Sequence, residues 1–438
     1  MVSKIIMALS CAAPLFICAG MLYLYLGLHL GMQAQIESPY GFMDQSGKQV
    51  VDLREARNKS YEVSDFCEER AVVAQRYDPQ EAYMIDRSGQ EVGDTFKRLD
   101  QLSEGFAAAQ PLDARLDLLP TKNYFSHEKR YLWGFADNSG KLKIKAQFRQ
   151  VRPFKNGLAA VMPEGSQLWG FIDTSGKLII PAIYQGADSF SEEIAVVCIN
   201  EKWGLIDRSG KYVLKPAFDS QIMQFKEGLA AVYEAKYIAD PNATIGKFRK
   251  TPVDSSRFEI SEVKYLNRQG HVALTVHPSP DLSKRFILLN EPNSIIAWDG
   301  TDTSCNWGFQ HKAGFDFAEG LAVLRQGDKY GFIDQTGKYI IAPQFDYAWT
   351  FKEGRAKVYK DIDGGKYSFI DRNGKLISPY LYYSAEEYSE GFARVEKCKN
   401  DRPVFIDKSG RPVTFPDYSF SGNFHNGLAR IGSQIVYP

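Results

Sequence analysis

A four-residue pattern of the form Asp-x-Ser-Gly recurs along the chain and constrains its fold more than any other feature. The pattern and its close variants end at nine glycines: Gly47, Gly89, Gly140, Gly176, Gly210, Gly270, Gly337, Gly374 and Gly410. Several intervals between them are close to 36 residues, which is the signature of a tandem repeat. In such arrays each copy buries its apolar face against its neighbours, so the repeat predicts one extended array rather than several independent cores.

Each copy has three recognisable parts. The first is an aromatic-Gly segment such as "WGFID", and its aromatic residues are Trp133, Trp169, Trp203, Trp307 and Tyr330. The second follows the turn and often contains a proline, as in "KLIIPAIY". The third has the form F-x-E-G-L-A-x-V, as in "FKEGLAAV" from Phe225. These aromatic residues are expected to form the core between repeats, because an aromatic at the same place in every copy suits a buried contact.

The turn pattern has a direct chemical explanation. In "IDTSGK" the Asp173 carboxylate can accept a backbone N–H two residues on, and Gly176 can take a positive φ at low cost. This predicts a hairpin in every copy, followed by a third strand. Pro181, Pro216 and Pro343 are expected to end pairing at the second strand, because proline donates no hydrogen bond. The predicted structural turn residues are Asp137, Gly140, Asp173, Gly176, Asp207, Gly210, Asp334, Gly337, Asp371, Gly374, Asp407 and Gly410.

The predicted fold class is therefore all-β: tandem three-stranded β-meander repeats of about 36 residues in a curved solenoid or a propeller-like array. An aromatic content of 13% agrees, since aromatic side chains suit strands. Nine or ten copies exceed the roughly four to eight blades of an ordinary propeller. An open solenoid, or an array with irregular closure, is therefore expected.

The N-terminus predicts a membrane segment. Residues 5–32 carry no Asp, Glu, Lys or Arg, and a helix of that length can cross a hydrocarbon core of about 30 Å. Lys4 precedes the segment, and it ends without a convincing signal-peptidase site. We expect an N-terminal signal anchor over residues 1–35 and a β-repeat domain over residues 36–438, held outside the cytoplasm. The alternative is a secreted protein whose signal peptide is cleaved.

These motifs resemble the WG repeat found in many bacterial proteins. The resemblance covers residues 40–438 and is carried by W-G-[FL]-I-D-x-[ST]-G-K, the following proline and F-x-[ED]-G-L-A-x-V. It implies an all-β repeat domain used for binding or scaffolding rather than catalysis, and it implies no defined substrate.

One segment departs from the repeat. Between residues 235 and 306 only "YLNRQG", which ends at Gly270, is recognisable, and Trp307-Gly308 then opens a copy whose turn is lost. Insertions in repeat proteins often form loops on the binding face. This segment is therefore an expected place for function, with a neutral surface excursion as the alternative.

Composition and motifs exclude several kinds of activity. Lys plus Arg equals Asp plus Glu, so no basic surface for nucleic acid is expected. No nucleophile elbow, phosphate-binding loop or zinc motif is present. No catalytic residue, cofactor or metal site is predicted. Cys67, Cys198, Cys305 and Cys398 lack the spacing of zinc ligands and leave their disulfide state open.

Taken together, these observations predict a non-catalytic, membrane-anchored protein of the cell envelope that binds a protein or a surface polymer through its repeats. One alternative is a carbohydrate-binding module, which requires Trp133, Trp169, Trp203 and Trp307 to be partly exposed in a line. Another is an enzyme with a site in residues 235–306, which requires His271, His277 or His311 to meet carboxylates in a pocket.

Overall fold

The computed structural model describes twelve segments of the chain, and every element named in them is a β-strand. The described residues are 40–54, 61–75, 81–113, 131–238, 257–277, 285–288, 295–298, 316–362, 364–379, 381–399, 401–415 and 420–432. The all-β prediction is confirmed. The expected transmembrane helix lies outside these segments. Within them, no helix is long and apolar enough to cross a membrane.

The strands of the described chain form nine antiparallel units, and eight of these have an inner, a middle and an outer strand. The inner strands are β4 (Ala71–Gln75), β7 (Phe106–Pro111), β10 (Leu158–Pro163), β14 (Ile194–Ile199), β17 (Leu229–Ile238), β22 (Leu321–Gln326), β26 (Ala356–Lys360), β29 (Phe392–Glu396) and β33 (Leu428–Ile431). The middle strands are β5 (Ala82–Ile85), β8 (Trp133–Asp137), β11 (Trp169–Asp173), β15 (Lys202–Asp207), β18 (Arg257–Asn267), β23 (Lys329–Asp334), β27 (Lys366–Ile370), β30 (Val404–Asp407) and β1 (Gly41–Asp44).

The outer strands complete the units, which we number 1 to 9 in the order of these inner strands. They are β6 (Glu91–Leu99), β9 (Leu142–Val151), β12 (Leu178–Tyr184), β16 (Tyr212–Phe218), β19 (Val272–Val276), β24 (Tyr339–Phe345), β31 (Pro412–Val413) and β2 (Gln49–Asp52). In unit 7 a single bridge from Ile370 to Leu376 takes the place of an outer strand. Five further strands pair with inner strands: β3 (Tyr61–Val63), β13 (Gly186–Ala187), β25 (Tyr347–Ala348), β28 (Ser384–Ala385) and β32 (Phe420–His425). A separate hairpin, β20 (Arg285–Leu288) with β21 (Ile295–Trp298), lies between units 5 and 6 along the chain.

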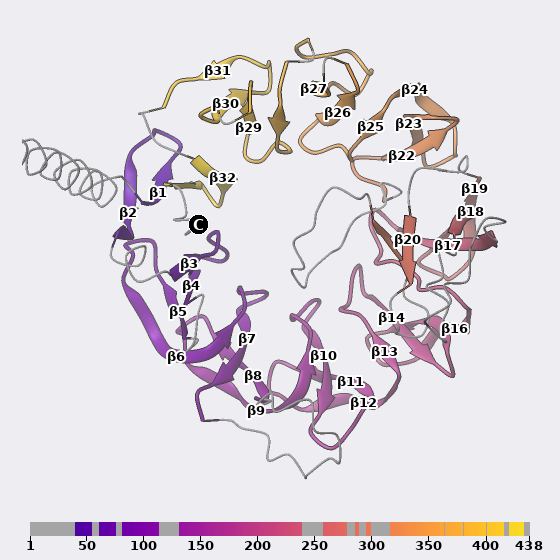
Figure 1. Cartoon of the computed structure of the whole chain (residues 1–438). Coiled ribbons are helices and arrows are strands. Elements are labelled where there is room, and N and C mark those ends of the chain that lie inside the picture. Colours follow the sequence, from indigo (N-terminus) through magenta and orange to yellow (C-terminus); the bar gives the residue numbers. More distant parts are fainter. Residues whose placement is uncertain are drawn as a thin grey trace, which may run out of the picture.

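The units follow one another around a ring, and the inner strand of each lies on the side of its middle strand that faces the centre (Figure 1). The two ends of the described chain meet in unit 9, where β1 pairs with β33 in a register that joins Gly41 to Ile431 and Asp44 to Leu428. Of the two arrangements predicted, the propeller-like array is therefore the one observed, and it closes.

Neighbouring units share their cores. One cluster joins Ala160 and Phe171 of unit 3 to Val197 and Ile206 of unit 4. In the same cluster the Phe171 ring packs edge-to-face on Phe190, with centroids 5.0 Å apart. A three-stranded unit is too thin to bury its own apolar face, so each unit takes half of its core from the next.

The unit boundaries differ from those expected. The F-x-E-G-L-A-x-V segment is the inner strand of the unit whose aromatic-Gly strand follows it, as in the pairing of Leu158 with Asp173. Two copies of this segment were also missed: "FCEERAVV" from Phe66, and "LSEGFAAA" from Leu102. They open units 1 and 2. Residues 257–277 form the regular β18–β19 pair of unit 5, although they fall within the stretch expected to be irregular.

The prolines do not end the outer strands as predicted. Pro181, Pro216 and Pro343 lie inside β12, β16 and β24, where each pairing register shifts. A β-bulge leaves residues out of the regular ladder, so it tolerates a residue that has no N–H to donate.

Candidate functional site

The aromatic-Gly motif is used for packing. Trp169 and Trp203 are buried, with 7% and 8% of their surfaces exposed, while Trp133 and Tyr330 are half-buried. Trp307 lies outside the described residues. The carbohydrate-binding alternative requires a row of exposed tryptophans. Trp169 and Trp203 are buried and cannot belong to such a row.

The glycine of the motif allows the strands to approach closely. A Cβ atom on Gly170 would lie 2.6 Å from the Ile180 carbonyl oxygen, and one on Gly204 would lie 2.6 Å from that of Leu214. These contacts fall at the register shift between the middle and outer strands. Any side chain here would force the two backbones apart, which explains why the motif needs glycine.

The Asp-x-Ser-Gly turns are held by their aspartates. In the turn of unit 3, Asp173 Oδ1 accepts the Ser175 N–H at 2.9 Å, the Ser175 hydroxyl at 2.6 Å and the Lys177 N–H at 3.1 Å. The same three contacts recur at Asp44, Asp86, Asp137, Asp207, Asp334 and Asp407. Asp371 accepts the two N–H groups only, because Asn373 stands in place of the hydroxyl residue.

The turn glycines lie on the preceding unit. Gly140, Gly176, Gly210, Gly337, Gly374 and Gly410 all have positive φ. A Cβ atom on Gly176 would lie 2.9 Å from the Ile144 side chain of unit 2, and one on Gly374 would lie 2.9 Å from Ile341 of unit 6. The aspartates are therefore committed to turn geometry, and the glycines lie at the contact between one unit and the preceding one.

These turns predict acid sensitivity. Hydrogen bonds from Ser175, Ser209 and the equivalent hydroxyls lower the pKa of the turn carboxyls from their ordinary value of 3.8. A pKa lower in the folded than in the unfolded chain stabilises the fold above the unfolded value and loses that contribution as the pH falls through the folded value. We expect the melting temperature to fall between about pH 4 and pH 2, and to fall less steeply when Ser175 and Ser209 are replaced by Ala. A melting temperature that stays constant between about pH 4 and pH 2 would contradict the role given to the turn carboxylates.

A second set of carboxylates joins one unit to the next, and the sequence reasoning missed it. Each inner strand begins at a Glu-Gly turn or a variant of it, where the first residue has a φ near +50°, as in Glu68, Glu104, Glu227, Glu319 and Glu353. The Glu68 carboxylate accepts the N–H groups of Glu104 and Gly105 at 2.6 and 2.7 Å. Two successive N–H groups in a turn form a concave anion site, and here the anion is the glutamate of the preceding unit.

The pattern continues around the ring. Glu104 accepts from Asn156 and Gly157, Glu192 from Gly228, Glu227 from Glu319 and Gly320, Glu319 from Gly354, Glu353 from Glu390 and Gly391, and Glu390 from Gly427. The link from Glu227 to Glu319 makes units 5 and 6 direct neighbours although about 90 residues separate their turns. The signal was present in the sequence as a Glu or Asn at this place in each unit, followed by Gly in seven of the nine described units and by Glu in units 1 and 4.

A substitution at Glu353 tests this set. Partial burial opposes ionisation of Glu353, but the N–H groups of Gly391 and Glu390 and the Lys408 ammonium outweigh it, so its pKa is lowered. Glu353→Ala should reduce the free energy of unfolding by about 2 kcal/mol, because it leaves two amides without their acceptor. Glu353→Gln should cost less, and Glu164→Ala, in an exposed hairpin, should cost almost nothing. Denaturant titration measures all three, and equal losses for Glu353→Ala and Glu164→Ala would refute the role.

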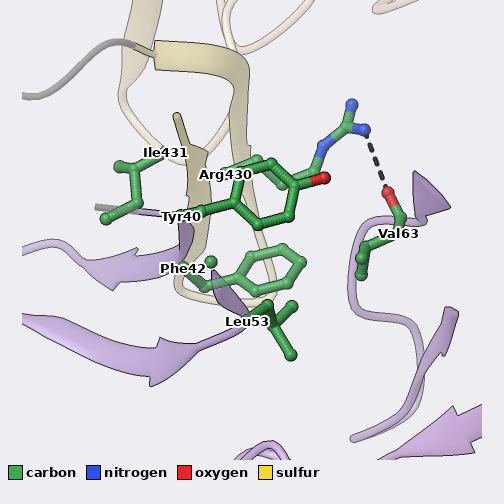
Figure 2. A pocket seen from close by; sticks show the side chains of 7 residues that line it. Tyr40, Phe42, Leu53, Val63, Arg430 and Ile431 are labelled. Atoms are coloured by element: carbon green, nitrogen blue, oxygen red, sulfur yellow. Dashed lines mark hydrogen bonds between the residues drawn. The ribbon is translucent and has the colours of Figure 1, made fainter. Parts of the chain in front are cut away.

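The ring closure carries further polar contacts. Asn426 Nδ2 donates to the Phe66 carbonyl at 2.6 Å, and Arg87 donates to the Asn426 carbonyl at 2.8 Å. Arg430 donates to the Val63 carbonyl at 3.1 Å (Figure 2). It also forms an ion pair with Asp65, whose Oδ1 lies 2.8 Å from Nε. A small pocket lies here, lined by Tyr40, Gly41, Phe42, Leu53, Val63, Arg430 and Ile431. Its one charged side chain is already paired, so the pocket is part of the closure.

The two faces of the ring differ. On one, which we call the turn face, the Glu-Gly turns and the Asp-x-Ser-Gly turns lie together, since Leu158 pairs with Asp173 and Leu321 with Asp334. On the opposite hairpin face, short hairpins join inner to middle strands, as at residues 200–201. The long connections also leave from this face: residues 112–132 join β7 to β8, and residues 239–256 join β17 to β18.

An aromatic cluster lies toward the hairpin face of units 6 and 7. Successive ring centroids are 5.9 Å apart for Tyr330 and Tyr347, 5.7 Å for Tyr347 and Tyr359, and 5.0 Å for Tyr359 and Tyr367. Lys357 Nζ lies 4.3 Å from the centroid of the Trp349 ring and 5.6 Å from that of Tyr367. Burial lowers the pKa of Lys357, against the opposing charges of Glu387 and Glu386. Tyr347 is 40% exposed, so the cluster reaches the surface.

The residues considered for chemistry are dispersed. His271 and His277 are exposed at the two ends of β19, and His311 lies outside the described residues. Among the residues that the structure describes, no group of three or more His, Cys, Asp or Glu could hold a metal ion. Cys67, Cys198 and Cys398 are free thiols, and Cys305 is not described. Burial raises the pKa of the Cys198 and Cys67 thiols, which makes them poor nucleophiles.

A closed ring of three-stranded antiparallel units, linked by repeated turns, defines a propeller-like β-repeat protein. The model for the WG containing repeat matches residues 133–165, 169–203, 203–235, 330–367, 367–399 and 405–431. The chain belongs to the family of WG-repeat proteins, and the resemblance found in the sequence is confirmed.

The solved structures that align with this chain do so at low sequence identity and low TM-scores. BamB from Moraxella catarrhalis aligns over 90% of this chain and 98% of its own, at 8% identity and a TM-score of 0.34. Hsv2 from Kluyveromyces lactis aligns over 82% and 100%, at 9% identity and a TM-score of 0.34. No curated protein matches the sequence. Nothing about the ligands of this chain follows from likenesses at this level.

Proposed function

We propose that the chain is a non-catalytic interaction scaffold that binds a protein or a surface polymer through the hairpin face of its ring. The observation that carries the proposal is the contrast between the two faces. The turn face repeats the same carboxylate contacts from unit to unit, so its polar groups are used to hold the ring. The hairpin face varies in connection length and presents the aromatic cluster.

The aromatic cluster has the character of a binding surface. Tyr and Trp are enriched in protein interfaces because they bury a large area at low conformational cost. Here Tyr347 and Tyr359 pack on each other and on the Tyr330 and Tyr367 rings, so their positions are fixed before a partner arrives. Preorganised side chains lose less entropy on binding.

We further propose that the ring is held at the membrane by residues 5–32, with the body outside the cytoplasm. The support is the uncharged N-terminal sequence, which falls outside the described residues. The body would then be periplasmic or extracellular, and a protease added to spheroplasts with an intact cytoplasmic membrane should digest the ring. Full protection of the ring in spheroplasts, with digestion after lysis, would place it in the cytoplasm.

The test of binding uses the full chain as bait in envelope extract, with variants on the two faces. In one variant a short Gly-Ser linker replaces residues 240–255, which lie between β17 and β18 and leave all nine units complete. A second variant is Tyr347→Ala. The matched control is Leu178→Ala, which removes a side chain of similar exposure, 44% against 40%, near the turn face. Loss of the same captured species in both hairpin-face variants, but not in the control, supports the proposal. Equal capture by all four proteins contradicts it.

A further inference from the structure

The outer strands form the circumference of the ring, and in units 3, 4, 5 and 6 the outer strand ends its sheet. A strand at a sheet edge presents unpaired N–H and C=O groups, which can pair with another chain. Soluble proteins commonly block such edges with proline, with charged side chains or with very short strands. An outer strand of this ring that lacks all three features is therefore open to pairing with another chain.

All the described outer strands but one have a proline or a charged residue. Pro181, Pro216, Pro343 and Pro412 interrupt β12, β16, β24 and β31, and charged residues lie in β6, β9 and β2. The exception is β19 of unit 5, whose sequence "VALTV" has neither proline nor charge, although it shares with β12, β16 and β24 the register shift opposite the middle strand. β19 lies at the end of the β17–β18–β19 sheet, and within the described chain no strand pairs with its other edge.

The side chains of β19 leave that edge open. Val272 is 50% exposed, Ala273 and Thr275 are exposed, and Val276 is buried against the unit core. Leu274 packs on the same core and on Gly337 of unit 6. The strand is thus fixed on one face by the ring, while small side chains on the other allow a second backbone to approach.

We propose that two copies of this chain associate by antiparallel pairing of their β19 strands, which joins two three-stranded sheets into one of six strands. With the two-fold axis at Leu274, Val272 lies opposite Val276 of the second copy, and Ala273 lies opposite Thr275. No like charges face each other in this register, and β-branched pairs stabilise it. The contact uses the same surface on both copies, so it closes at a dimer.

A second copy fits this edge for two reasons. The strand is complementary to itself in the antiparallel direction, whereas a self-pairing of β9 would bring Lys143 and Lys145 of two copies together. The chain also has equal numbers of acidic and basic residues, so no net charge opposes association. Pairing at the circumference leaves the hairpin face free, and the dimer does not depend on the function proposed for that face.

Sedimentation equilibrium of the full-length chain in mild detergent tests the proposal, with Ala273→Lys as the variant and Ile179→Lys as its matched control. Ala273 and Ile179 each lie three residues after their turn glycine, and both are exposed. The wild type and Ile179→Lys should dimerise with rising concentration. Ala273→Lys should weaken the dimer at least about tenfold, because the charge has no partner in the new sheet.

Two results would overturn the proposal. One is a wild-type chain that stays monomeric up to roughly 100 µM, where even a weak specific contact would be populated. The other is a dimer that both variants weaken equally, or that neither weakens. Circular dichroism melts of both variants confirm that each ring is folded. Because capture by the hairpin face is measured separately, a failure here leaves that function standing, and the reverse also holds.

Discussion

A chain that ends after Phe415 should fail to form a stable ring. It lacks β32 and β33 and therefore leaves β1 without its inner partner. Five large side chains lose their burial: Phe424, Leu428 and Ile431 are removed, and Phe42 and Met43 are uncovered. At about 1.5–3 kcal/mol for each side chain, the loss is on the order of 10 kcal/mol, which is comparable with the whole stability of an ordinary domain.

The measurement is thermal unfolding followed by circular dichroism, together with the yield of soluble protein. The control is a chain that ends after Gly432, which keeps β33 complete. The control should melt as the full chain does, and the shorter chain should show no cooperative transition. An equally cooperative transition in both would mean that the array is stable when open, as in a solenoid.

Gly170→Ala should have the next largest effect. A methyl group at this position would lie 2.6 Å from the Ile180 carbonyl oxygen and 2.8 Å from the Ala182 nitrogen, and both are backbone atoms that no rotamer change can move. We expect a loss of about 3 kcal/mol or more in the free energy of unfolding, at the upper end of overpacking substitutions.

The control for this change is Gly165→Ala. Gly165 has a φ of +79° but open space around it, so the substitution costs only the strain of a left-handed alanine, about 1–2 kcal/mol. Denaturant titration of the two variants separates close approach from backbone strain. If Gly165→Ala were the more damaging change, steric contact at the bulge would not explain the Trp-Gly motif.

The sequence predicted the local chemistry of this fold well. Aspartate and glycine in "IDTSGK" specify a hairpin through contacts within five residues, so Asp173 and Gly176 could be assigned a role without knowledge of the rest of the chain. The alternation of short apolar runs with turns likewise predicted an all-β array, which is confirmed.

Long-range pairing could not be predicted in the same way. Which strand pairs with the aromatic-Gly strand depends on contacts between copies, and every copy offers the same local pattern. The Glu193 turn of unit 4 was harder still, because a positive φ of 70° at a glutamate has no local sequence signature. Closure depends on Gly41 meeting Ile431, which no repeat period indicates.

The sequence predicted only part of the candidate site, because the remaining contacts depend on how neighbouring units are arranged. Glu68 and its equivalents looked like turn residues, and only the structure shows their carboxylates on the next unit's amides. That β17 ends and β18 begins at the hairpin face follows from the strand order, which the sequence left open. The unprotected edge of β19 could be recognised only once Val272–Val276 was known to be an outer strand.

The central claim is that the ring closes through β1 and β33, and a disulfide tests it most directly. Met43 and Ala429 are register partners and both are fully buried, so cysteines at both positions should bond, given that such partners lie about 4.5–5.5 Å apart at Cα. The control pairs a cysteine at Met43 with one at Ala393, which is equally buried but in β29 of unit 8. The account predicts a linked peptide in the non-reduced digest of Met43→Cys/Ala429→Cys and none for Met43→Cys/Ala393→Cys. No link in the first, under conditions that oxidise exposed thiols, would contradict a closed ring.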